Sequence, residues 1–121
     1  MTAPPKAIYN VANYKINIKL VSGYQEVVKQ IMEFEWDPNK SDDNLKKHGI
    51  TFHEASTVFG DPLAITFNDP YHSMVEHRFL TFGCSRAGQL MVVVHTERHE
   101  KTRIISARRA TRQERKIYED G

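Results

Sequence analysis

Residues 89–119 read QLMVVVHTERHEKTRIISARRATRQERKIYE, and this stretch decides the fold. It begins with the apolar run 90–96, whose three consecutive valines predict a central strand that is buried on both faces. A polar turn at 98–101 leads to a second strand at 102–108, and a short helix is expected to start at Thr111. The stretch therefore predicts two neighbouring strands followed by a C-terminal helix.

The same stretch is rich in cations. Residues 98–116 contain eight Lys or Arg against two acids, a net charge of +6, whereas residues 33–76 contain nine acids and three bases, a net charge of −6. Arginine presents a planar set of donors that matches phosphate oxygens. The asymmetry indicates a localised site for an anion rather than non-specific coating of nucleic acid. A solvated surface face remains the alternative for any single cation.

Length and composition limit the class of protein. A chain of 121 residues can bury a core as one domain without a metal or a disulfide. Its single cysteine, Cys84, cannot form an internal disulfide and fits a reducing compartment. No run approaches the roughly 20 apolar residues of a membrane span, and no secretory signal is visible. We therefore expect a cytoplasmic protein that does not enter a membrane.

The middle of the chain supplies the other elements of an α+β domain. Alternating patterns predict strands at 33–37, 63–68 and 76–84. One helix is expected to begin at Ser41 or Asp42 and end at Gly49, and a second is expected to begin at Thr51. The expected fold is a mainly antiparallel sheet with two N-terminal helices and a short C-terminal helix.

Residues 1–31 are interpreted as an N-terminal extension, and residues 32–121 as the principal domain. Alternation at 14–20 predicts an additional strand, and a capping box of Ser22 and Gln25 predicts a short helix through Ile31. Met32 is an alternative start of translation, because the self-consistent pattern begins there. On that alternative the extension would be an artefact of an upstream start.

Several motifs occur in an order that resembles the BrnT toxin family. They are FEWDPNK at 34–40, NLKKHG at 44–49, FHEASTVF at 52–59, EHR at 76–78, VVVHTER at 92–98, RIISAR at 103–108 and ERKIYE at 114–119. The resemblance covers about three-quarters of the chain. It has no counterpart in the first 31 residues.

The resemblance implies a compact fold similar to RelE and to microbial ribonucleases. It implies the toxin of a type II toxin-antitoxin system, which inhibits translation by cleaving RNA without the ribosome. It also implies neutralisation by a BrnA-type antitoxin that carries a DNA-binding domain, in a hetero-oligomer that contacts DNA through the antitoxin.

RNA cleavage without a metal requires a base for the 2′-hydroxyl, positive charge at the phosphate and an acid for the leaving 5′-oxygen. His, Glu and Arg are side chains that can meet these requirements. We expect antiparallel strand order to bring side chains of three strands to one edge of the sheet, namely Glu76, Arg78, His95, Arg103 and Arg108. The catalytic candidates are Glu76, Arg78, His95, Arg108 and Tyr118, and the RNA-binding candidates are Lys46, Lys47, Arg98 and Arg103.

Each catalytic candidate also has a structural alternative. His95 shares strand parity with Met91 and Val93, so a hydrogen-bonded core histidine competes with a catalytic one. The carboxylate and the arginines can form ion pairs, and Tyr118 can close the core.

Two other functions compete with the ribonuclease reading. His95 and His99 suggest a metal site, but on a strand they would stand about 13 Å apart, too far to share one ion. No metal or cofactor is therefore expected. The second alternative is a nucleic-acid-binding or antitoxin-binding module without catalysis. Cleavage of RNA in EDTA distinguishes the enzyme from that module.

Overall fold

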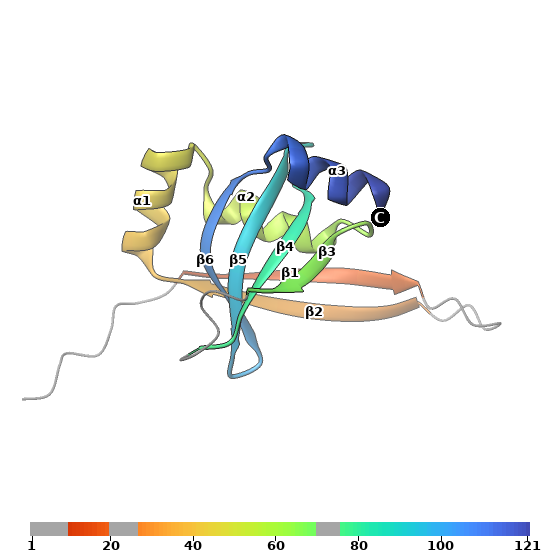
Figure 1. Cartoon of the computed structure of the whole chain (residues 1–121). Helices are drawn as coiled ribbons and strands as arrows, with labels where there is room; N and C mark the ends of the chain where they lie inside the picture. The colour runs from red at the N-terminus through yellow and green to blue at the C-terminus, as the bar shows by residue number, and fades with distance from the viewer. Residues whose placement is uncertain (1–9, 20–26, 70–75) are drawn as a thin grey trace, which may run out of the picture.

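A six-stranded mixed sheet, in the order β1-β2-β6-β5-β4-β3, forms the centre of the computed structural model (Figure 1). The structure describes residues 10–19, 27–69 and 76–121, with side chains from residue 32 onward. The strands are β1 (Asn10–Lys19), β2 (Val27–Trp36), β3 (Ile65–Asn68), β4 (Arg78–Cys84), β5 (Leu90–Arg98) and β6 (Lys101–Arg109). Neighbouring strands are antiparallel except β2 and β6, which run parallel.

Helices follow β2 and end the chain. They are α1 (Pro38–His48), α2 (Phe52–Ser56), the 3-10 turn η1 (Thr57–Gly60) and α3 (Arg112–Asp120). The Asp37 carboxylate caps the start of α1 by accepting a hydrogen bond from the backbone N–H of Asn39 at 2.8 Å. Gly49 ends the helix with φ 68, a left-handed conformation that suits glycine. None of the helices in the described part of the chain is long and apolar enough to cross a membrane.

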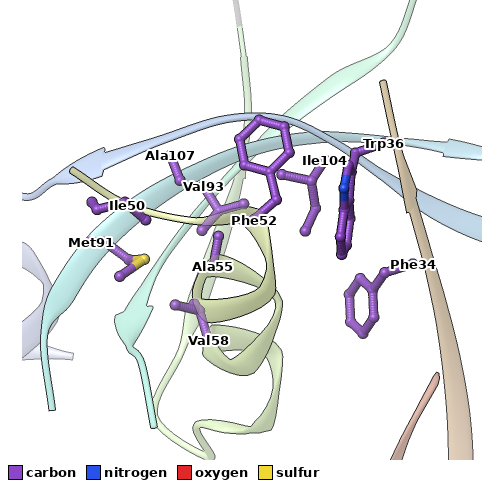
Figure 2. Packing of buried hydrophobic residues seen from close by; sticks show 10 residues of the cluster. All are labelled: Phe34, Trp36, Ile50, Phe52, Ala55, Val58, Met91, Val93, Ile104 and Ala107. Carbon is purple, nitrogen blue, oxygen red and sulfur yellow. The ribbon is translucent and has the colours of Figure 1, made fainter. Parts of the chain in front are cut away.

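The hydrophobic core lies between one face of the sheet and α2 with η1. Figure 2 shows Phe52, Ala55 and Val58 directed at side chains of the strands. Alternation along β2 and β5 places every second side chain on this face, whereas on β6 a β-bulge lets both Ile104 and Ala107 reach it. The core cluster consists of Phe34, Trp36, Ile50, Phe52, Ala55, Val58, Met91, Val93, Ile104 and Ala107.

A buried asparagine joins α1 to the sheet. The Asn44 amide donates to the carbonyl oxygens of Ile50 and Ala107 at 3.0 and 2.9 Å, and its Oδ1 accepts from the Ala107 amide at 3.0 Å. Asn44 is 5% exposed, so losing these bonds would leave buried backbone groups without partners. The asparagine of the NLKKHG motif therefore fixes where α1 crosses β6.

Most sequence expectations for residues 32–121 are confirmed. The fold is α+β with a largely antiparallel sheet, β5 and β6 form the expected hairpin, and α3 begins at Thr111 with a reciprocal capping box to Glu114. Thr51 also begins its helix as expected, by accepting from the Glu54 amide at 3.1 Å.

The expected helix through Ile31 is wrong. Residues 27–36 form β2 without a break, because they pair along their whole length with β1. The β-branched residues Val27, Val28 and Ile31 also favour a strand. Ser22 and Gln25 lie outside the described residues. The expected start of α1 at Ser41 or Asp42 is wrong too, since Asp37 caps the helix and Pro38 occupies its first turn.

Candidate active site

The sheet face opposite α2 carries a polar row formed by Arg78, Thr96, Arg103 and Glu35. Strand register pairs Arg78 with Thr96, Thr96 with Arg103, and Arg103 with Glu35, on β4, β5, β6 and β2 in turn. Paired residues on neighbouring strands project from the same face. Val93 has the opposite parity to Thr96 on β5 and lies in the core. The row therefore faces away from the core.

Glu76 joins two arginines at the end of this row, and we call Glu76, Arg78 and Arg98 the Glu76 cluster. The Glu76 carboxylate lies 3.5 Å from Arg78 Nε and 3.8 Å from Arg98 Nη2. The side chains of Arg78, Glu76 and Arg98 are 27%, 31% and 47% exposed, so an external ligand can reach all three. Two guanidinium groups share one carboxylate. The cluster is therefore net positive and has N–H donors for an anion.

A cavity of about 480 Å³ opens beside the Glu76 cluster. This volume is in the range of small-ligand sites and is large enough for part of a nucleotide. It is lined by Glu76, His77, Phe79, Thr96, Glu97 and Arg98.

His77 lies in this cavity wall, and the sequence reasoning missed it as a site residue. Its ring is exposed, and Nε2 lies 3.0 Å from Asn68 Oδ1. The His77 carbonyl accepts from Thr96 Oγ1 at 2.6 Å, which ties the loop before β4 to β5. An imidazole is the side chain suited to proton transfer near neutral pH. The available signal was its place between Glu76 and Arg78 in the EHR motif.

His95 lies in the core and is 5% exposed. Its Nε2 is 2.7 Å from Thr81 Oγ1, and its ring stacks on Phe79 and meets the edge of Phe59. Burial lowers the pKa of His95 from 6.5 to about 4, so the imidazole is neutral at neutral pH. Of the two readings of this residue, the geometry matches the hydrogen-bonded core histidine.

Arg108 and Tyr118 lie away from the Glu76 cluster, near the start of strand β5. Arg108 pairs with Val92, four residues along β5 from Thr96, which is about 13 Å. Its guanidinium makes two hydrogen bonds to Glu114 at 2.7 and 2.8 Å, and these hold the pKa of Glu114 at about 2. The expectation that Arg108 and His95 gather at one edge with Glu76, Arg78 and Arg103 is therefore wrong. Arg78 and Arg108 project from the same face, but their partners on β5, Thr96 and Val92, are four residues apart.

Tyr118 is held by the turn before β3. Its hydroxyl donates to Asp61 Oδ2 at 2.6 Å, and this hydrogen bond raises the pKa of Tyr118. The same Asp61 oxygen accepts from the Cys84 amide at 2.8 Å. Tyr118 thereby fastens α3 to the end of β4.

The RNA-binding candidates are divided in the same way. Arg98 belongs to the Glu76 cluster, and Arg103 belongs to the polar row, where its Nε lies 3.6 Å from Glu35. Lys46 and Lys47 are exposed in the last turn of α1, which packs on β6 through Asn44 near Ala107. These lysines are on a different element from the Glu76 cluster.

The described residues include no group of three or more His, Cys, Asp or Glu side chains that could hold a metal ion. His95 points into the core, and His99 is exposed in the β5–β6 turn with φ 51.

These features define a class of protein: a small α+β domain whose sheet exposes a basic cluster beside a cavity with an accessible histidine. A site of this kind fits the phosphate groups of RNA.

A family model described as "Ribonuclease toxin, BrnT, of type II toxin-antitoxin system" matches residues 36–114. This is more than half of the chain, so the chain belongs to the BrnT family of ribonuclease toxins, and the resemblance of the motifs is confirmed. Membership of a type II toxin family implies an antitoxin partner and an RNA substrate.

A solved structure is similar in fold. The ribonuclease toxin BrnT of Brucella abortus matches with a TM-score of 0.50 and 21% sequence identity, over 64% of this chain and 94% of that one. No curated protein sequence matches the chain.

The buried His95 predicts loss of stability in acid. Its pKa is lowered from 6.5 to about 4, so an unfolded chain binds a proton before the folded one does. The free energy of unfolding should therefore be complete above pH 6.5 and fall by about 3 kcal/mol as the pH drops to about 4. His95→Gln, which can still bond Thr81 and does not titrate, should lack this component.

Urea denaturation at neutral and acidic pH measures the effect, and His99→Gln in the exposed turn is the control. If the wild-type protein and His95→Gln show the same pH dependence, the burial of a neutral His95 is contradicted.

Proposed function

We propose that the chain is an endoribonuclease that acts without a metal ion and without the ribosome, and that the Glu76 cluster with His77 is its active site. The observation that carries the proposal is the sharing of one carboxylate, Glu76, by two accessible arginines, beside a cavity that Glu76, Arg98 and the exposed His77 line. By cleaving RNA, the enzyme would inhibit translation as the toxin of its pair.

Arg78 and Arg98 are assigned to the scissile phosphate. A guanidinium gives parallel donors to two phosphate oxygens and keeps its charge at any physiological pH. Contacts of 3.5 and 3.8 Å to Glu76 are long for charge-assisted hydrogen bonds, so a phosphate can improve on them. Arg103, two strands from Arg78 on the polar row, is assigned to a neighbouring phosphate.

Glu76 and His77 are assigned to proton transfer. Glu76 takes the proton of the 2′-hydroxyl, whose oxygen attacks phosphorus, and the bond from phosphorus to the 5′-oxygen breaks. His77 gives its proton to that oxygen. The products are a 2′,3′-cyclic phosphate and a 5′-hydroxyl, and no metal is needed because the arginines balance the charge.

His95, Arg108 and Tyr118 act through other residues in this proposal. His77 lies against Phe79 with ring centroids 4.6 Å apart, and Phe79 stacks on His95 at 5.6 Å. His95 is therefore assigned to positioning the histidine of the cavity. Arg108 and Tyr118 are assigned to holding α3, and Lys46 and Lys47 to outer contacts with RNA.

The wider assignments follow the motifs. We propose a RelE-like fold for residues 32–121 and an extension for residues 1–31, supported by a family match that begins at residue 36. The RNA substrate and the single cysteine support action in the cytoplasm. The partner is assigned as a BrnA-type antitoxin through which the pair binds DNA.

Removing either arginine of the cluster should slow cleavage of RNA. In EDTA, Arg78→Ala and Arg98→Ala should each lower the cleavage rate by about 100-fold, because one donor group at the phosphate is lost. Labelled single-stranded RNA on a denaturing gel measures the rate. Arg112→Ala, an exposed cation at the start of α3, is the control and should cleave normally. Binding without cleavage by the wild-type protein would support the non-catalytic module instead.

The role of His77 as the acid predicts rescue by a better leaving group. His77→Ala should lose about 100-fold in rate on ordinary RNA. It should recover on RNA whose 5′-bridging oxygen is replaced by sulfur, because a thiolate leaves without protonation. Arg78→Ala should gain little from the sulfur substitution. A His77→Ala defect of equal size on both substrates would exclude the assigned role.

Neutralisation is expected to occur by exclusion of RNA. The antitoxin should cover the sheet face that carries the polar row and the Glu76 cluster. An equimolar amount should therefore abolish cleavage, and a large excess of RNA should slow formation of the complex. Cleavage assays with added antitoxin measure both effects. A structure of the complex in which Arg103 and Arg108 are fully exposed would contradict this mode of inhibition.

A further inference from the structure

An exposed phenylalanine lies on the same sheet face as Arg78. Phe67 is on β3, the strand at one end of the sheet, and its side chain is 41% exposed. It pairs with Leu80, which is two residues from Arg78 on β4, so all three side chains project from one face. The face that carries the polar row thus also carries an accessible aromatic ring.

The ring of Phe67 is held in place from one side. It packs against Phe82 with ring centroids 5.2 Å apart and an interplanar angle of 56°, and Phe82 is buried. The other large apolar residues that are exposed in the described part of the chain, Leu45, Leu63 and Ile117, are aliphatic. Phe67 therefore differs from them by offering a supported aromatic surface to solvent.

The spacing fits one nucleotide beside the cleaved bond. Two residues along β4 span about 7 Å and one strand spacing adds about 4.8 Å at a right angle, so the Cα atoms of Phe67 and Arg78 are roughly 8 Å apart. This is within the reach of a base whose own or adjacent phosphate lies at Arg78. Basic groups that follow the backbone, next to an aromatic ring that takes a base, are the usual combination for binding single-stranded nucleic acid.

From this geometry we infer that Phe67 is a base-stacking subsite that takes one unpaired nucleobase flanking the scissile phosphate at the Glu76 cluster. The inference rests on the proposed active site. RNA is favoured over a protein occupant because the ring lies beside arginines that complement phosphate. A phenyl ring has no hydrogen-bonding group, so the subsite takes any base and selects for an unpaired strand rather than for a sequence.

A binding cycle tests the subsite. The probe is a short single-stranded RNA with a 2′-deoxy nucleotide at the mapped cleavage position, so it cannot react, and with an abasic nucleotide placed at each flanking position in turn. Fluorescence anisotropy measures the Kd for wild-type protein, Phe67→Leu and Phe67→Trp. Leu63→Ala, an exposed apolar residue in the turn before β3, is the control, and thermal melting checks that each variant is folded.

We expect Phe67→Leu to weaken binding of the intact RNA by about tenfold and Phe67→Trp to retain it. An abasic nucleotide at one flanking position should weaken binding by the wild-type protein by the same factor and leave binding by Phe67→Leu almost unchanged. Equal affinity of wild-type and Phe67→Leu for intact RNA would overturn the inference, as would a defect of Phe67→Leu confined to antitoxin binding.

The same materials separate this inference from the proposed function. If wild-type protein fails to cleave the all-ribose RNA, the proposed function fails, and the binding cycle, run on that unreactive RNA with the abasic nucleotide moved along the whole strand, still decides whether Phe67 takes a base. If wild-type protein cleaves and Phe67→Leu binds every probe normally, only the subsite is lost.

Discussion

Strand β5 is hydrogen-bonded on both sides, to β4 and to β6, and is buried along most of its length. This double pairing fixes the alternation of side chains on three strands at once, because paired residues must share a face. Val93 and His95 enter the core, and Thr96 takes its neighbours Arg78 and Arg103 to the opposite face. A shift of register by one residue would bury the arginines and expose the histidine, so the basic face depends on the burial of β5.

Strands β4, β5 and β6 could be predicted from the sequence because they are short, strongly patterned and joined by turns. The run 90–96, the alternation at 76–84 and the capping box at Thr111 each determine local structure by themselves. The region 27–31 could not be assigned in this way. The β-branched residues of this region favour a strand only weakly, and its ten-residue pairing with β1, which local pattern does not show, decides the outcome. The prediction of where α1 starts failed for a smaller reason: Asp37, Ser41 and Asp42 are all good caps, and Pro38, which suits the first turn of a helix, follows Asp37.

The candidate site was predicted in part. Strand parity correctly raised the core alternative for His95, and the expected ion pairing of Glu76 with arginines is present. It could not give the distance between Arg78 and Arg108, because that depends on how far each residue lies along β5 from a common partner. His77 was missed because the alternation at 76–84 places it on the opposite side of the expected strand from Glu76 and Arg78. At the end of a strand that assignment fails, since the sheet no longer covers the side chain, and Asn68 holds the ring at the cavity instead.

The charge asymmetry of the sequence has a structural outcome that the count of charges did not reveal. Lys101 and Arg103 lie at 3.8 and 3.6 Å from Glu33 and Glu35, so cations of the basic segment meet acids of the acidic one where β6 runs beside β2. Arg108 is likewise matched by Glu114. Each such pair contributes at most about 1 kcal/mol where it is exposed, and Glu33 and Glu35 offset two of the six excess positive charges of the segment. The Glu76 cluster differs because one carboxylate is shared by two arginines. The cluster keeps one excess positive charge and N–H donors for an anion, and the proposed RNA site is placed there for that reason.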